Sequence, residues 1–241
     1  MSERLTPRQR ARQATLEEIK RLAREQLSRT GSAGISLREI ARELNIVSSA
    51  VYRYFPSRDE LLTELIVEAY DALGDVAEAA SAATAGEPPL VRWAAIARAI
   101  RRWALADPAE WALIYGSPVP GYQAPGERTI EPATRVPRVL LELLADIEAA
   151  GGSPVAASFP APGGVVGADL EGVRAAIGRP IPDTLLLAGL AAWSFLFGAI
   201  NLELFGHFTN VITDFDAYFE VQVERIASSL GLNVAAERPT N

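Results

Sequence analysis

Residues 36–62, SLREIARELNIVSSAVYRYFPSRDELL, decide the fold of this chain. Ser36 and Glu39 have the spacing of a capping box, in which the Ser36 hydroxyl accepts from the Glu39 amide and Glu39 reaches back. A short helix follows with its apolar residues on one face, and Asn45 opens a tight turn, where Asn tolerates the left-handed backbone. A second short helix is predicted for residues 48–54. Two short helices joined by such a turn form a helix-turn-helix, whose second helix can lie in a DNA major groove.

Helices are predicted on both sides of this motif. Apolar residues at helical spacing between Leu16 and Leu27 predict a helix that Gly31 and Gly34 end. After the motif, a second capping box at residues 57–60 opens a long helix that is predicted to continue to about Ala83. The motif therefore belongs to a three-helix domain that a long helix continues.

The charge of the chain is divided unevenly along its length. Residues 1–60 hold twelve Arg or Lys against eight Asp or Glu, whereas residues 61–241 hold eleven against twenty-two, and the net charge is -7. A basic head followed by an acidic body indicates that the head meets phosphate and the body does not.

The remaining two thirds of the chain alternates helical patterns with breaks rich in Pro and Gly, and shows no useful run of period-two alternation. Helices are predicted near residues 89–106, 108–115, 134–150, 183–205 and 214–230, with a short helix near 169–177. Residues 116–132 and 151–182 are predicted to be long loops, and the residues after Leu232 a flexible tail. The fold class is therefore predicted to be all-α.

Composition excludes several kinds of function. The chain has no Cys and a single His, His207, so disulfides, thiolate nucleophiles and metal sites are not expected, and neither is a cofactor. The N-terminus is charged and lacks the apolar segment of a secretory signal, which predicts a cytoplasmic protein. The most apolar run, residues 185–200, is shorter than the ~20 residues of a membrane span, and we interpret it as a buried helix or a subunit interface.

Residues 12–62 strongly resemble the DNA-binding region of the TetR family. The shared features are an Ile-Ala pair at residues 40–41, a turn that ends in Val-Ser at 47–48, the run Val-Tyr-x-Tyr-Phe at 51–55 and Ser-Arg-x-x-Leu at 57–61. Asn45 stands where a Gly is usual, and it tolerates the same backbone angles. Arg58 replaces the commoner Lys and keeps its charge. The resemblance implies an all-α protein that binds double-stranded DNA.

The resemblance assigns phosphate contacts to Tyr52 and Tyr54, because a phenol can hydrogen bond to a phosphate oxygen while its ring packs on the protein. Arg58 lies at the N-terminus of the long helix, where its charge and the free amides both favour a phosphate. A basic arm with Arg4, Arg8, Arg10 and Arg12 is expected to follow an adjacent groove.

Base edges are expected to be read from the exposed start of the second short helix. Ser48 and Ser49 can hydrogen bond to bases, whereas Ala50 offers only an apolar contact, for instance to a thymine methyl. Arg38 and Arg53 are expected to contact a guanine or a phosphate. The candidate DNA-binding residues are therefore Arg38, Ser48, Ser49, Ala50, Tyr52, Arg53, Tyr54 and Arg58.

Residues 80–230 resemble the sensor domain of a TetR subgroup with a Trp-x-x-x-His-Gly signature, in which Phe197 here replaces the His. The resemblance implies a small-molecule effector among the central helices and a homodimer through the last two long helices. Gly189, Ala192 and Ala199 are small enough for close approach of a second subunit. Aromatic side chains favour an apolar or aromatic effector, and the candidate ligand-binding residues are Trp93, Trp111, Tyr115, Trp193 and Phe197.

Three segments are expected: a helix-turn-helix DNA-binding domain with its basic arm at residues 1–60, a larger helical ligand-binding and dimerisation domain at 61–232, and a flexible tail at 233–241. The expected function is that of a repressor that a small effector releases from a near-palindromic operator. An enzyme is the main rival class, but the sequence has no Gly-rich phosphate loop and no recognisable Ser/His/Asp set. A constitutive regulator without an effector and a helical interaction module that no longer binds DNA are the alternatives.

Overall fold

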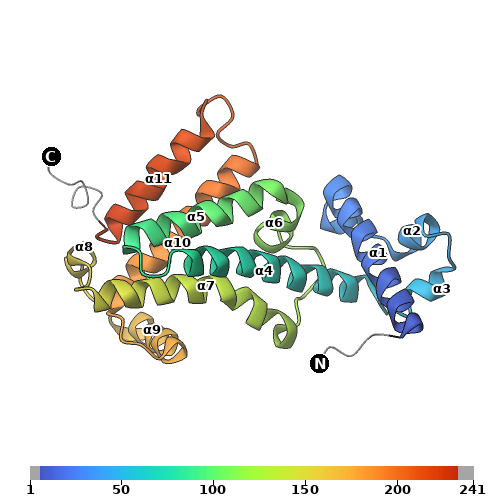
Figure 1. Ribbon diagram of the computed structural model, residues 1–241, viewed down its shortest axis with the longest axis horizontal. Coiled ribbons are helices and arrows are strands. Elements are labelled where there is room, and N and C mark those ends of the chain that lie inside the picture. Colours follow the sequence, from blue (N-terminus) through green and yellow to red (C-terminus); the bar gives the residue numbers. More distant parts are fainter. Residues whose placement is uncertain (1–5, 233–241) are drawn as a thin grey trace. The chain divides into compact units, whose positions relative to one another are not determined.

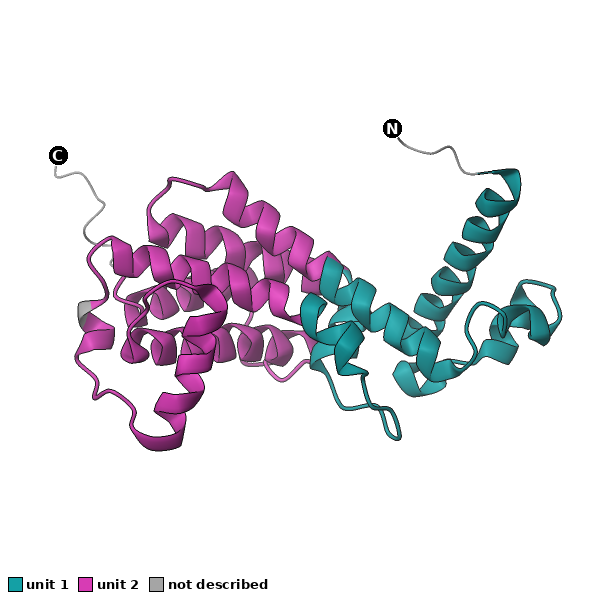
Figure 2. Cartoon of the chain, turned by 90° about the horizontal axis from the view of Figure 1, so that it is seen from below, with its two compact units in different colours: residues 1–71, 107–132 teal, residues 72–106, 133–241 magenta. Residues whose placement is uncertain are grey.

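The computed structural model of this chain describes residues 6–232. Eleven α-helices and one short 3-10 helix form the regular structure of these residues, and none of the described residues lies in a strand (Figure 1). The predicted all-α class is confirmed. The chain divides into two compact units (Figure 2): a first unit of Met1–Asp71 with Asp107–Pro132, and a second unit of Ala72–Ala106 with Ala133–Asn241.

The first unit is built on α1 (Pro7–Thr30), the 3-10 helix (Ser32–Gly34), α2 (Leu37–Glu43), α3 (Ser48–Val51) and the first part of α4 (Arg58–Ala83). Its second segment adds α6 (Pro108–Tyr115) and the start of α7 (Gly126–Ala149). Ile19, Ile40 and Leu61 are fully buried in its apolar core, and Leu113 and Tyr122 of the second segment pack against that core. Both segments therefore share one core.

The second unit holds the remainders of α4 and α7 together with α5 (Pro89–Ala106), α8 (Pro154–Ala157), α9 (Gly164–Ile177), α10 (Asp183–Leu204) and α11 (Phe215–Ser229). Helix α10 contacts α5, α8, α9 and α11, which makes it central to this unit. The Arg101 guanidinium of α5 donates to both carboxylate oxygens of Glu203 on α10, at 2.7 and 2.9 Å, and fixes the two helices together.

The helix-turn-helix forms as predicted. Asn45 has a φ of 53°, the left-handed backbone expected of the turn. The second short helix ends at Val51, before Tyr54. Only half of each predicted capping box forms. The Ser36 and Ser57 hydroxyls accept from the amides three residues on, at 3.3 and 3.1 Å, whereas the Glu39 and Glu60 carboxylates lie 3.6 and 2.8 Å from the guanidinium groups of Arg42 and Arg128.

Several helix boundaries differ from the predicted ones. Helix α1 begins at Pro7, before Leu16, because Thr6 and Gln9 form a complete capping box and Pro suits the first helical position. Helix α7 begins at Gly126, inside a predicted loop, and continues through Pro132 and Pro137. Pro lacks the amide that a helix interior needs. Pro132 is nevertheless buried, which indicates that packing outweighs the missing hydrogen bond.

Within the second predicted loop, α9 is longer than expected and α8 was not predicted. The helices predicted near 89–106, 108–115, 183–205 and 214–230 form within one residue of those bounds. The predicted tail at 233–241 lies outside the described residues.

Candidate nucleic-acid interface and ligand cavity

Helix α3 offers a small polar surface. Val51 is fully buried and anchors the helix on the core of the first unit, whereas Ser48 and Ser49 are exposed and Ala50 is half-buried. Tyr52 and Arg53 follow directly and are also exposed, Tyr52 by 41%. The side chains predicted to read bases are therefore free to meet a partner, and their contact with DNA stays a prediction.

Tyr54 lies against α1 and not fully in solvent. It is half-buried, and the Arg12 guanidinium carbon lies 5.1 Å from the centre of its ring, within the range of a cation–π contact. Arg12 thus places a positive charge beside a phenol that was predicted to contact phosphate. Arg38 on α2 is exposed.

Arg58 is engaged within the first unit. Its Nη2 donates to the Ser32 carbonyl at 2.7 Å, and its Nη1 lies 3.7 Å from the Asp59 carboxylate. The side chain is 32% exposed. It therefore connects the start of α4 to the segment after α1, in addition to any phosphate contact, which stays a prediction.

The predicted basic arm is helical over most of its length. Arg8, Arg10 and Arg12 lie in α1, whose residues 6–14 are all exposed and whose N-terminal half stands away from the other helices of the first unit (Figure 2). The prediction of an arm apart from the helix was wrong here, because the Thr6 capping box starts the helix early. Arg4 lies outside the described residues.

A charged cluster that the sequence analysis missed joins α1, α4 and α6 inside the first unit. The Lys20 ammonium contacts the Glu68 and Glu17 carboxylates at 2.5 and 2.8 Å, and the Arg24 guanidinium contacts Glu68 and, at 2.7 Å, Glu110. Burial would lower the pKa of Lys20, but the hydrogen bonds to Glu17 and Glu68 raise it above its ordinary value. Lys20 comes four residues after Leu16 and three before the buried Ala23, on the apolar face of the helix, and that spacing was the signal available in the sequence.

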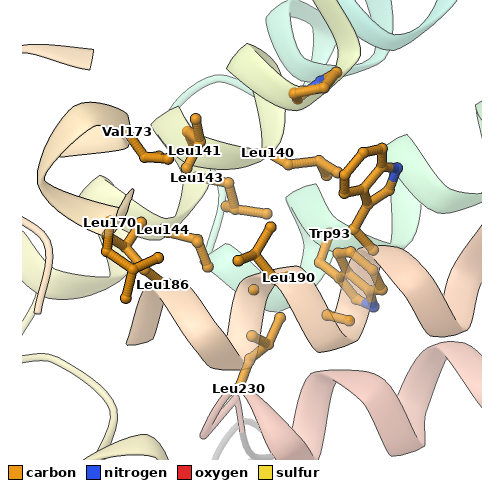
Figure 3. A pocket seen from close by; sticks show the side chains of 14 residues that line it. Trp93, Leu140, Leu141, Leu143, Leu144, Leu170, Val173, Leu186, Leu190 and Leu230 are labelled. Atoms are coloured by element: carbon orange, nitrogen blue, oxygen red, sulfur yellow. The ribbon is translucent and has the colours of Figure 1, made fainter. Parts of the chain in front are cut away.

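The second unit contains an apolar cavity of about 230 Å³ (Figure 3). Eight leucines, Val173, Ala192, Gly189, Pro137 and two tryptophans line it, and the side chains labelled in Figure 3 come from α5, α7, α9, α10 and the residue after α11. The predicted ligand residues Trp93 and Trp193 are both on the wall. Phe197 packs edge-on against Trp193, with ring centres 5.7 Å apart.

The other two predicted ligand residues lie elsewhere. Trp111 is fully buried and Tyr115 is half-buried, both in the first unit, with the Tyr115 ring centre 6.0 Å from that of Tyr70. Burial and the neighbouring Tyr70 raise the pKa of Tyr115 above its ordinary value. The structure therefore brings together three of the five predicted aromatic residues.

The two indole groups on the cavity wall differ in their hydrogen bonds. Trp93 Nε1 donates to the Val223 carbonyl at 3.0 Å. Trp193 Nε1 is buried and has no acceptor among the described residues. Such an unpaired buried donor is unusual in a folded protein.

Helix α10 exposes much of its apolar surface. By length and composition it is the one helix of the described chain that could cross a membrane, and only a third of its most apolar stretch is buried. Phe195, Leu202 and Phe205 are each at least 40% exposed. Gly189 and Ala192 instead face the interior: a Cβ on Gly189 would lie 2.2 Å from Leu144 Cδ1, and Ala192 is buried.

Comparison with known proteins relates both parts of the chain to regulators. A family model described as "Bacterial regulatory proteins, tetR family" matches residues 19–65, and one described as "Tetracyclin repressor-like, C-terminal domain" matches residues 93–226. The HTH-type transcriptional regulators Rv1816 of Mycobacterium tuberculosis and Mb1846 of Mycobacterium bovis are each 42% identical to this chain over 229 residues. The match covers 94% of this chain and 97% of each relative.

Solved structures show the same fold. The crystal structure of the protein SCO4313 is 38% identical, with a TM-score of 0.74, and the match covers 92% of this chain and all of that one. A protein from Rhodococcus sp. RHA1 is 22% identical, with a TM-score of 0.67 over 90% of this chain and 95% of its own.

Proposed function

Because this chain belongs to the TetR family of bacterial regulatory proteins and is a transcriptional regulator, we propose that it acts as a repressor that leaves its operator when a small effector binds. Its relatives are transcriptional regulators and not enzymes. The family also supports a cytoplasmic location. The proposal divides the work between residues 1–60, which bind DNA, and residues 61–232, which sense the effector and dimerise.

The exposed start of α3 supports DNA recognition by the first unit. Ser48 and Ser49 hydrogen bond to base edges and Ala50 contacts an apolar base surface. The phosphate contacts are made by the phenols and cations around α3. These are Tyr52, Tyr54, Arg58, Arg38 and Arg53.

The cavity of the second unit is the observation that carries the proposal of an effector. A partly open apolar cavity among the helices of a regulator is the kind of site that small ligands occupy. Trp93, Trp193 and Phe197 are the proposed aromatic residues of this site. Trp111 and Tyr115 belong to the first unit and are not on the wall of this cavity.

A homodimer follows from the exposed apolar residues of α10 and α11. Phe195 and Leu202 of α10, Phe205 directly after it and Val221 of α11 would remain in water in a single subunit, and a second copy of the chain would cover them. Two copies related by a two-fold axis carry two α3 helices, so the operator is near-palindromic.

Helix α4 supports a coupling between the two functions. Its residues 58–71 belong to the first unit and 72–83 to the second, so one continuous helix takes part in both. An effector that binds better to the released form shifts the population by its difference in affinity. A difference of about 5.5 kcal/mol takes a two-state protein from almost fully bound to almost fully released.

Selection of DNA from a random library by the purified protein, followed by footprinting, tests the proposal. We expect two inverted half-sites whose centres lie about one helical turn, ~34 to 36 Å, or a multiple of it apart. Ser49→Ala should change the preferred bases, whereas Ser228→Ala on α11, also exposed, serves as the matched control. A single unrepeated half-site would contradict DNA recognition by a dimer. Failure to select any sequence would favour a helical interaction module that does not bind DNA.

The effector part is tested by titration of the protein–operator complex with a compound library, following Trp fluorescence and DNA release together. Release by at least one compound, reduced in Trp193→Ala at unchanged DNA affinity, is the expected result. Compounds that bind tightly and never release DNA would favour a constitutive regulator.

A further inference from the structure

The wall of the cavity in the second unit restricts the chemistry of what can enter it. Its side chains are eight leucines, Val173, Pro137, Ala192, Gly189 and two indoles, and none of them is ionisable. A carboxylate or ammonium group placed there would lose its hydration and gain no partner from the wall, which is strongly unfavourable. The cavity therefore selects against charge.

Its size restricts the ligand as well. The volume is about 230 Å³. An apolar cavity of ~150 Å³ can take benzene, which has six carbon atoms, and in proportion this one takes about nine non-hydrogen atoms. Long acyl chains and fused ring systems are larger than that.

The indole groups offer no hydrogen bond to a ligand. Trp93 Nε1 already donates to Val223, so it is not available to a ligand. Trp193 Nε1 has no acceptor among the described residues, but it is buried away from any water-sized space and is closed to a ligand in the cavity as well.

From these observations we infer that the cavity takes an uncharged, mainly aliphatic molecule of about nine non-hydrogen atoms whose one neutral oxygen stays at the open side of the cavity, such as a medium-chain alcohol. The inference rests on the proposed function only for the role of this molecule as effector. It narrows the apolar or aromatic effector expected from the sequence, because eight of the wall residues are leucines.

The test is calorimetric titration of the DNA-free, full-length protein with straight-chain alcohols of five to twelve carbons and with the carboxylates of the same lengths at pH 7.5. Each added methylene should tighten binding about fourfold up to about octanol, after which affinity should stop rising. Octanoate should bind at least about tenfold more weakly than octanol. Octanoate that binds as well as octanol, or an affinity that rises through dodecanol, would overturn the inference.

Two variants of opposite sense test that binding occurs in this cavity. Val173→Phe adds four non-hydrogen atoms to the wall and should shorten the preferred alcohol by about four carbons, whereas Leu140→Ala removes three and should lengthen it by about three. Val91→Phe on α5, exposed and not on the wall, is the matched control and should leave the series unchanged. If either wall variant fails to fold, the other variant still tests the site. An unchanged preferred alcohol length in the folded variant would overturn the assignment of binding to this cavity.

Operator release is measured separately, so that the two proposals can fail independently. Alcohols that bind with the expected length limit and never release DNA would support the ligand class and contradict the effector role. Release of DNA by a charged compound that competes with octanol would overturn the ligand class and support the effector role.

Discussion

Arg58 has one contact that the structure shows and one that is predicted, and one substitution tests both. It was predicted to contact phosphate, and its guanidinium also donates to the Ser32 carbonyl at 2.7 Å. Arg58→Ala should therefore lower the free energy of unfolding by about 1 to 2 kcal/mol, measured by urea denaturation. It should also reduce the salt slope of DNA binding by about one, measured by fluorescence anisotropy.

Tyr52→Phe is the matched change, because Tyr52 is 41% exposed and its hydroxyl makes no hydrogen bond with another described residue. It should weaken binding to all DNA sequences while the stability changes by less than about 0.5 kcal/mol. An Arg58→Ala protein with altered base preference and an unchanged salt slope would show that Arg58 does not contact phosphate.

Asp146 makes the stability of the second unit depend on pH. Its carboxylate lies 2.5 Å from Arg92 and 2.8 Å from Arg179. Burial would raise the pKa of Asp146, but hydrogen bonds from both arginines hold it below its ordinary value. A carboxyl with a lowered pKa stabilises the folded protein above its unfolded pKa of ~3.9, and the stabilisation is lost as the pH falls through the folded value.

Asp146→Asn should therefore be less stable than the unchanged protein at pH 7, and the difference should shrink as the pH falls below about 4. Urea denaturation of both proteins at pH 7, 5, 4 and 3 measures this difference. Asp75→Asn, on the exposed ion pair with Arg135, is the control and should show a smaller effect. A difference that grows on acidification would contradict the assignment.

Residues of the helix-turn-helix could be identified in the sequence because the motif depends on the spacing of residues within one short segment, 36–62. Ile40, Val51 and Leu61 are buried as their helical positions predict, and Ser48 and Ser49 are exposed. The contacts of Lys20 with Glu68 and of Arg24 with Glu110 join residues far apart in the chain. Helical periodicity shows which residues of one helix share a face, but it carries no information about pairs on different helices. For the same reason it could not show that Trp193 lines the cavity whereas Trp111 lies in the first unit.

The first turns of α1 are an element whose stability does not come from packing. Residues 6–14 are exposed, carry Arg8, Arg10 and Arg12, and contain no acidic residue. Arg8 and Arg12 lie four residues apart on one face of the helix. Arg8→Gln with Arg12→Gln should reduce the salt slope of DNA binding by about two and leave the preferred sequence unchanged.

The salt dependence is measured by anisotropy between 50 and 300 mM KCl, with Arg225→Gln on α11 as the control, because Arg225 is an exposed arginine of the second unit. The same slope in the double variant and in the control would show that the start of α1 does not meet DNA.

The bounds of α5, α10 and α11 were predicted to within one residue, because Pro89 and Pro182 mark the starts of α5 and α10 and Asp214 caps α11. Helix α7 was placed too late because Pro132 signals a break in any local view, while tertiary packing keeps the helix intact. Helix α8 has four residues, too few for a periodic pattern.

The proposed homodimer would assemble through the exposed apolar face of α10. Phe195→Arg places a charge at a position that is 49% exposed in the single chain, so the chain should still fold but no longer dimerise. Sedimentation velocity measures the mass, and circular dichroism confirms the helical content. Leu105→Arg on α5, 40% exposed, is the matched control and should leave the dimer intact.

A folded Phe195→Arg protein with the mass of the dimer would place the interface elsewhere. Ala192, which the sequence indicated as an interface position, is unsuitable for this test because it is buried on the wall of the cavity.

The segment Asp107–Pro132 belongs to the first unit, although the chain on both sides of it belongs to the second. The polypeptide therefore passes between the two units three times, within α4, between α5 and α6, and within α7. A fragment cut after residue 71 would leave the core around Leu61 without Leu113 and Tyr122, which cover it. The DNA-binding unit of this protein therefore cannot be transferred as one continuous segment. A chimaeric protein that contains it needs three junctions and must include residues 107–132.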